Sequence, residues 1–277
     1  DACRVVKRLN EQGKLGTIDV LGEEAERRDE AETLVEEYMH VFETIREQGL
    51  NTGVSVKLTG LGLKPDRDFC VANLARIVRC ASERNNFVRI DMEDSSTTSD
   101  TLAIYRELRA EGHENVGIVL QARLRRTLDD IRELAELRPS VRVCKGIYVE
   151  PPDIAYQEDQ EVRENFVQAV DELLAADSYV AVATHDEWVI EEAQRLFQKY
   201  RRARSEYEFQ MLLGVREHLG DALVREGHRV RIYVPFGRRW YEYSIRRLQE
   251  NPAIAGYVAV DTLNRLVPRR DGRNPRA

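Results

Sequence analysis

Polar and charged residues stand at the ends of several short apolar runs along this sequence. Arg142 lies inside one such run, and Lys145 follows it directly. A charged side chain in an apolar strand is costly to bury unless it is paired. The residues placed in this way are Lys57, Asp91, Glu93, Asp94, Gln121, Arg142, Lys145, Tyr148, Thr184, His185, Gln210 and Tyr233. Their position at the same end of each run predicts a ligand site, and the alternative is a rim of salt bridges that serves only stability.

A second group of residues follows the last apolar run. Tyr243, Arg246, Arg247 and Glu250 are spaced i, i+3, i+4 and i+7, which places them on one face of a helix. Two adjacent guanidinium groups repel each other unless an anion lies between them, and their planar fork suits a carboxylate. The group therefore indicates an anion site, with a solvated basic helix face as the alternative.

The sequence lacks the motifs of several other chemistries. Gly60 and Gly62 have no third glycine at the required spacing, which argues against a Rossmann dinucleotide site. There is no P-loop and no G-x-S-x-G motif, and the five histidines are too scattered to predict a metal site. Lys145, at the end of an apolar run, leaves open a class I aldolase reaction through a Schiff base.

Composition narrows the class of protein further. The chain has 42 Lys and Arg against 49 Asp and Glu, a net charge of −7, which argues against a nucleic-acid binder. Cys3, Cys70, Cys80 and Cys144 show no C-x-x-C spacing, so we expect dispersed, buried and reduced thiols. No apolar run approaches the roughly 20 residues of a membrane span, and no signal peptide is evident. Because the chain opens with Asp1, we expect a fragment or a processed product.

The elements that must position these side chains alternate along the whole chain. The predicted strands are 16–21, 53–58, 87–92, 116–120, 141–144, 180–183, 208–212 and 229–234. The stretches between them show apolar residues at helical spacing, most clearly at 30–48, and a short helix is expected at 2–12. Eight strand–helix units predict a (β/α)8 barrel with its site at the carboxyl ends of the strands. A doubly wound open sheet is the alternative.

Domain organisation follows from the same pattern. A barrel of this kind takes about 250 residues as one domain. We therefore expect a single domain over 1–267, followed by a flexible tail at 268–277 that is rich in Arg, Asn, Pro and Gly.

Eight runs of this sequence, in order, resemble those of the proline dehydrogenase family: SVKLTGLG, RIDMED, VLQA, VRVCKGIY, VATH, EFQML, RIYVPFG and YSIRRLQEN. They cover roughly 16–260, and the short bacterial single-function form is the more similar one. The resemblance implies a distorted barrel that holds FAD non-covalently and oxidises L-proline to Δ1-pyrroline-5-carboxylate by hydride transfer to flavin N5. It also implies a membrane quinone as electron acceptor and a separate pyrroline-5-carboxylate dehydrogenase as functional partner. We expect a cytoplasmic protein, peripheral to the inner membrane where it meets the quinone.

The resemblance also assigns roles to residues. It implies that Arg246 and Arg247 clamp the proline carboxylate with the help of Lys57. The proline pocket would be lined by Asp91, Tyr148, Leu212, Tyr233 and Tyr243. The flavin would be bound by Gln121, Arg142, Lys145, Gly146, Thr184, His185 and Gln210. Within this family, oxidation of 4-hydroxyproline is an alternative that the bulk of Tyr243 disfavours, and a barrel without catalysis is a further one. Members of the family usually carry helices before the first strand, whereas this chain begins almost at the barrel.

Overall fold

The computed structural model describes residues 2–22 and 24–237, and these residues form a closed barrel of parallel strands. The strands are β1 (Leu15–Val20), β2 (Thr52–Val56), β3 (Val88–Ile90), β4 (Val116–Gln121), β5 (Ser140–Cys144), β6 (Tyr179–Ala183), β7 (Tyr207–Leu212) and β8 (Val230–Phe236). Each strand pairs with the next, and β1 also pairs with β8, so the sheet has no edge. The predicted barrel is confirmed, and the open sheet is excluded.

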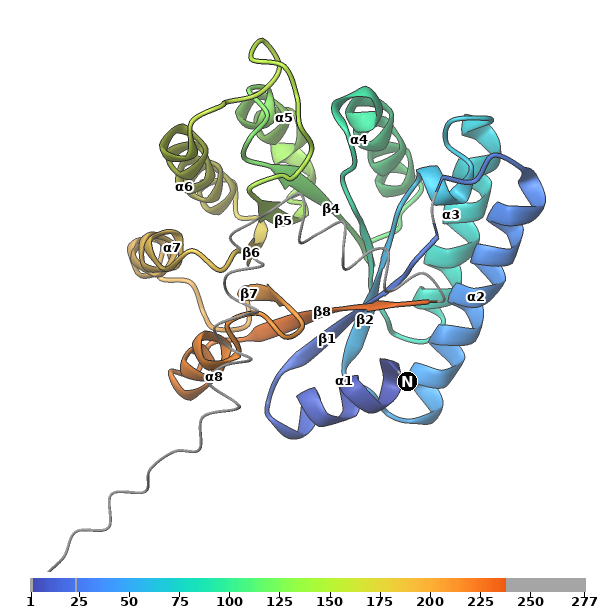
Figure 1. Ribbon diagram of the computed structural model, residues 1–277, viewed down its shortest axis with the longest axis horizontal. Helices are drawn as coiled ribbons and strands as arrows, with labels where there is room; N and C mark the ends of the chain where they lie inside the picture. The colour runs from blue at the N-terminus through green and yellow to red at the C-terminus, as the bar shows by residue number, and fades with distance from the viewer. Residues whose placement is uncertain (1, 23, 238–277) are drawn as a thin grey trace, which may run out of the picture.

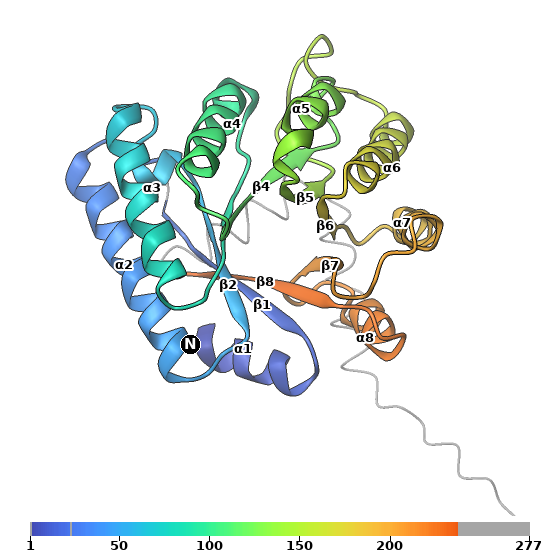
Figure 2. The same ribbon diagram turned by 180° about the vertical axis from the view of Figure 1, so that it is seen from behind.

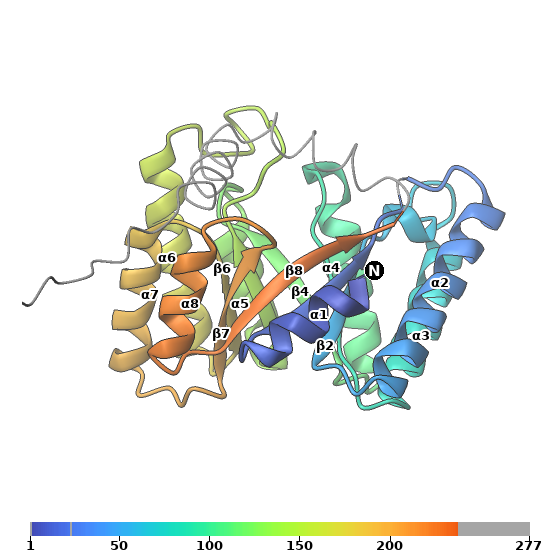
Figure 3. The same cartoon turned by 60° about the horizontal axis from the view of Figure 1, so that its bottom comes forward.

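Helices surround the barrel and connect its strands (Figures 1 and 2). They are α1 (Ala2–Glu11), α2 (Arg28–Glu47), α3 (Arg67–Ser82), α4 (Ser95–Ala110), α5 (Thr127–Leu134), α6 (Asp159–Ala175), α7 (Glu187–Lys199) and α8 (Glu217–Arg225), with 3-10 turns η1 (Thr59–Leu61) and η2 (Ala135–Leu137). The helix α1 precedes the first strand and lies against β1 and β8 (Figure 3). It thereby covers the outer face of the barrel where the sheet closes.

Local sequence explains why these helices form and where they start. In α2 the apolar side chains Leu34, Tyr38 and Phe42 recur at four-residue spacing, and all three are buried against the sheet. Asp66 caps α3 by accepting a hydrogen bond from the backbone N–H of Phe69. Asp94 caps α4 in the same way, through Ser96. Asp94, which the sequence grouped with the strand-end residues, thus has a structural role.

The barrel interior is polar, unlike the branched apolar filling usual in this fold. Arg89 in β3 is 4% exposed and donates hydrogen bonds to the carbonyl of Ile118 and to both oxygens of Ser140. Burial, and then the nearby charge of Arg142, lowers the pKa of Arg89 to about 9. A Cβ at Gly117 would clash with the Arg89 guanidinium, so glycine there makes room for it. Charged residues inside the strands are therefore part of the packing.

The structure corrects several details of the sequence prediction. Lys57 and Asp91 do not belong to strands, because β2 ends at Val56 and β3 ends at Ile90. Tyr148 lies in the loop that follows β5. The four cysteines are free, as expected, but only Cys70 and Cys80 are buried; Cys3 and Cys144 are partly exposed. The predicted tail at 268–277 lies outside the described residues.

Candidate active site

Side chains from six strands or their ends meet inside the carboxyl end of the barrel. We call the following residues the strand-end cluster: Asp19, Ser55, Lys57, Asp91, Arg142, Gln210 and Tyr233. Alternate residues of a strand point to opposite faces of the sheet, which is why Arg142 and Gln210 reach the interior from β5 and β7. The closed ring of strands brings Lys57 and Tyr233, which are 176 positions apart in sequence, into contact.

Asp91 is the centre of the strand-end cluster. Its two carboxylate oxygens accept hydrogen bonds from Arg142 Nη1 at 2.6 Å and from the Tyr233 hydroxyl at 2.8 Å. The Lys57 ammonium lies 3.5 Å from the same carboxylate. Burial would raise the pKa of Asp91, but the charges of Arg142 and Lys57 and the hydrogen bond from Tyr233 outweigh burial and lower it. Asp91 is therefore ionised, and its carboxylate is an anchor for donors rather than an effective base.

Lys57 is held between carboxylates. Its Nζ donates to Asp19 Oδ2 at 2.7 Å and lies 3.3 Å from the Tyr233 hydroxyl. Asp19, the next-to-last residue of β1, is fully buried, and its other oxygen has no hydrogen-bond partner among residues 2–22 and 24–237. Two cations, Lys57 and Arg142, thus face two carboxylates, Asp19 and Asp91, so the charges of these four groups sum to zero.

A second group of side chains consists of Lys145 and Asp186, which follow β5 and β6, and Arg163, which lies on α6. Lys145 and Arg163 both donate to Asp186 Oδ2, at 2.6 and 2.7 Å. Burial would raise the pKa of Asp186, but the hydrogen bonds from these two cations outweigh burial and lower it. Two cations from different elements thus converge on one carboxylate at the rim of the barrel.

Gly146, in the loop that follows β5, lets the backbone lie close to the side chain of Gln121. Its φ of +94° lies in the left-handed region, and a Cβ there would come within 2.6 Å of Gln121 Oε1. Gln121 is buried and donates its amide to the carbonyl of Glu93. The backbone at Gly146 is thus pressed against a fixed polar side chain, with no room for a larger residue.

The remaining predicted residues fall into two sets. Thr184 and His185 follow β6, where the Thr184 hydroxyl accepts from the backbone of Asp186 and His185 Nε2 accepts from the backbone N–H of Leu212. Leu212 is the last residue of β7. Tyr243, Arg246 and Arg247, the predicted carboxylate clamp, lie outside the described residues, as does Glu250. Of the predicted substrate residues, the structure brings Lys57, Asp91 and Tyr233 into direct contact.

The structure adds residues that sequence reasoning missed. Asp19 and Ser55 hold Lys57 and Arg142, and Asp186 holds Lys145. Asp19 could have been noticed as a charge within an apolar strand. Ser55 and Asp186 carry no such signal. Arg142, predicted to contact the flavin, is bound to Asp91 and so belongs to the strand-end cluster.

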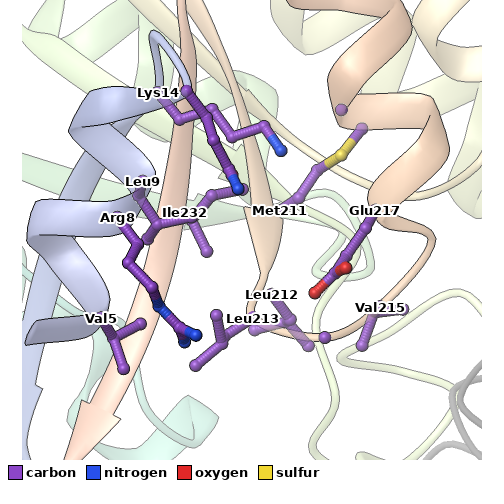
Figure 4. Close-up of a pocket in the computed structure, with 13 residues that line it drawn as sticks. Val5, Arg8, Leu9, Lys14, Met211, Leu212, Leu213, Val215, Glu217 and Ile232 are labelled. Atoms are coloured by element: carbon purple, nitrogen blue, oxygen red, sulfur yellow. The ribbon is translucent and has the colours of Figure 1, made fainter.

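A separate cavity of about 280 Å³ lies between α1 and the loop from β7 to α8 (Figure 4). Met211 and Ile232 line it from the barrel wall, and both alternate with the inward-facing Gln210 and Tyr233. The cavity is therefore on the outer face of the sheet, among the helices. The strand-end cluster, where the ionic contacts converge, is the better candidate for chemistry.

Neither a cluster of metal ligands nor a membrane-spanning helix occurs within residues 2–22 and 24–237. These residues contain no group of three or more His, Cys, Asp or Glu able to hold a metal ion. None of their helices is both long enough and apolar enough to cross a membrane.

Comparison with known proteins gives a consistent result over most of the chain. The sequence model of one family, described as proline dehydrogenase, matches residues 2–259. Proline dehydrogenase 1 of Bacillus subtilis is 38% identical over 257 residues, which are 93% of this chain and 85% of that protein. The proline dehydrogenase of Deinococcus radiodurans is 37% identical over 261 residues, 93% of this chain and 84% of that one.

Among solved structures, the fold matches a much longer protein. The proline utilization A of Bdellovibrio bacteriovorus, inactivated by N-propargylglycine, superposes with a TM-score of 0.80 at 25% identity. The match covers 85% of this chain and 29% of that one. The present chain thus corresponds to one part of the larger protein.

Proposed function

The chain belongs to the proline dehydrogenase family and oxidises proline in the first step of proline catabolism, and we propose that the strand-end cluster holds the substrate. The reaction removes a hydride from the ring carbon beside nitrogen and a proton from the nitrogen, giving Δ1-pyrroline-5-carboxylate. The single observation that carries the assignment of the site is the contact of Lys57, Arg142 and Tyr233 with Asp91 inside the carboxyl end of the barrel.

Enzymes of this family depend on a flavin, and we propose FAD as the cofactor here. The second group of side chains fits such a molecule. Lys145 and Arg163 place two cationic donors side by side, and donors of this kind suit a dinucleotide pyrophosphate. Gly146 lets the backbone pass close to Gln121, another residue proposed to contact the flavin, and Thr184 and His185 add polar groups beside Asp186. A bound flavin would supply the acceptor for the hydride.

The charge balance of the strand-end cluster suits proline, which is a zwitterion and also neutral overall. Lys57 would donate to the substrate carboxylate, and Asp91 would hold Lys57 and Tyr233 in place for that contact. Arg246 and Arg247 would supply the surplus positive charge that a carboxylate clamp needs. Such cations near the carboxylate also disfavour the protonated amine, which helps the nitrogen lose its proton.

The alternatives from sequence have no support in the structure. Lys145 donates to Asp186 at 2.6 Å, so its Nζ is held by a carboxylate and is not presented as a Schiff-base nucleophile. For 4-hydroxyproline, no described residue favours the additional hydroxyl group over proline.

We propose further that electrons pass to a membrane quinone, that a separate pyrroline-5-carboxylate dehydrogenase takes the product, and that the protein acts in the cytoplasm at the membrane periphery. Membership of the family supports these partners. A quinone-reduction assay with proline and lipid vesicles tests the first of them directly.

Substitution of Lys57 tests the assignment of the substrate site. In Lys57→Met we expect the KM for proline to rise about tenfold or more, because one charge-assisted hydrogen bond to the carboxylate is lost. The matched control is Lys199→Met, at an exposed ion pair with Asp171 at the end of α7. Steady-state reduction of an artificial electron acceptor measures both variants. An unchanged KM in Lys57→Met would remove Lys57 from the substrate site.

A further inference from the structure

Glu208 is a buried carboxylate that lies inside the barrel, closer than the strand-end cluster to the amino-terminal ends of the strands. It precedes Gln210 by two residues on β7, so both side chains point into the barrel. Glu208 is 2% exposed and accepts a hydrogen bond from Arg231 Nε, on the neighbouring strand β8, at 2.8 Å. It has no predicted part in binding proline or flavin. A buried charge at this point nevertheless requires an explanation.

The amide of Gln210 connects Glu208 to the strand-end cluster. Its Nε2 donates to Glu208 Oε1 at 2.5 Å, and its Oε1 accepts from Arg142 Nε. An amide can rotate to exchange its oxygen and nitrogen, but an ionised carboxylate only accepts hydrogen bonds. Glu208 therefore selects the rotamer in which the Gln210 oxygen faces Arg142. In the other rotamer an N–H donor would face the Arg142 N–H.

The guanidinium of Arg142 is then fixed on three sides. Nε is bound by Gln210, Nη1 by Asp91 at 2.6 Å, and Nη2 by the Ser55 hydroxyl at 3.0 Å. Because the guanidinium is planar, fixing these three nitrogens fixes its orientation and that of the Asp91 carboxylate. The contact of Glu208 with Gln210 therefore influences the orientation of Arg142 and Asp91, which belong to the strand-end cluster.

Arg231 keeps Glu208 in the acceptor-only form. Burial would raise the pKa of Glu208, but the charge and hydrogen bond of Arg231, and the hydrogen bond from Gln210, outweigh burial and lower the pKa to about 2. At neutral pH the carboxylate is fully ionised and cannot act as a donor. The Gln210 amide is therefore held with its nitrogen toward Glu208 and its oxygen toward Arg142.

We propose that Glu208 is a positioning residue of the active site, which acts through the Gln210 amide to orient Arg142 and Asp91. This inference rests on the proposed function, because the strand-end cluster is taken there as the proline site. Glu208 itself touches neither substrate nor cofactor.

A double-mutant cycle tests the proposal on the flavin-loaded protein. A glutamine at position 208 can present either its oxygen or its N–H to Gln210, so it no longer fixes the orientation of the Gln210 amide. In Glu208→Gln we therefore expect kcat/KM for proline to fall about tenfold or more, because the hydrogen bond from the charged Arg142 to Gln210 is weakened. In the background of Gln210→Met, which has no amide to orient, the same change should alter kcat/KM less than about twofold. Equal effects in both backgrounds would overturn the proposal. Glu206→Gln, the same change at an exposed position two residues earlier, is the matched control and should leave kcat/KM unchanged.

A second variant guards against misfolding, because Glu208→Gln leaves Arg231 buried without its counterion. The pair Glu208→Gln with Arg231→Met removes both charges with little change in volume. It should retain a cooperative thermal transition and show the same loss of kcat/KM as Glu208→Gln. A folded double variant with the activity of the starting protein would contradict the proposal.

A measurement without turnover separates this inference from the proposed function. In protein labelled with ¹⁵N-arginine, the Nε–H signal of Arg142, identified by its absence in Arg142→Lys, should exchange slowly with water. We expect Glu208→Gln to shift it and speed its exchange, and Glu206→Gln to leave it unchanged. An Arg142 signal unaffected by Glu208→Gln sinks the inference even if proline is oxidised. An affected signal in a protein that does not oxidise proline sinks the proposed function alone.

Discussion

Replacing Asp91 with Asn removes the charge on which the strand-end cluster depends. The carboxylate is 8% exposed and accepts from Arg142 at 2.6 Å and from Tyr233 at 2.8 Å. An amide has one acceptor oxygen, so one of these donors would face a second donor, and Arg142 would lose its buried counterion. Breaking a buried ion pair by removing one partner costs about 3–5 kcal/mol. We expect Asp91→Asn to lower the free energy of unfolding by about that amount.

Urea unfolding followed by far-ultraviolet circular dichroism measures this change. The matched control is Asp68→Asn, where the side chain is 98% exposed and lies 3.9 Å from Arg67, and no measurable change is expected. In parallel, kcat/KM for proline should fall by about a hundredfold or more, since Lys57 and Tyr233 lose a shared anchor. A loss of unfolding free energy below about 1 kcal/mol in Asp91→Asn would refute the reasoning that the cluster is a coupled, buried network.

Three further predictions follow from the same contacts. Tyr233→Phe loses the hydrogen bond to Asp91, so kcat/KM for proline should fall about tenfold in steady-state assays; an unchanged value removes the hydroxyl from the site. Because the pKa of Glu208 falls from 4.5 to about 2 on folding, its stabilisation is present above pH 4.5 and is lost as the pH falls toward 2. Between pH 4.5 and 2 the starting protein should therefore lose about 3 kcal/mol more unfolding free energy than Glu208→Gln loses, and equal losses would contradict this. Gly146→Ala should retain less flavin per chain after gel filtration, since its Cβ would meet Gln121, and full retention would contradict the tight approach.

The sequence was sufficient to predict the order and number of the strands. Buried parallel strands are short, apolar and bounded by helices of clear 3.6-residue spacing, and these are local properties. Strand ends were less certain. The β-rich run 87–92 predicts that Asp91 lies within a strand, whereas β3 ends at Ile90, although the Asp91 backbone N–H still donates to the carbonyl of Val56.

The contacts within the site could not be predicted from sequence. Arg142 and Asp91 are 51 positions apart, and Lys57 and Asp19 are 38 apart, so their pairing depends on strand order and register in the closed barrel. Polar residues at the ends of apolar runs can be recognised from the sequence as candidates for a site. Asp19 and Glu208 lie within runs, and only the inward direction of their side chains gives them a role.

We propose that this barrel holds a flavin and passes to it a hydride from proline. The most direct test is the visible spectrum of the purified protein before and after addition of L-proline without oxygen. We expect visible flavin bands that bleach with proline and persist with an equal concentration of sodium chloride. Flavin bands that remain with proline, or a colourless protein that FAD does not reconstitute, would contradict it.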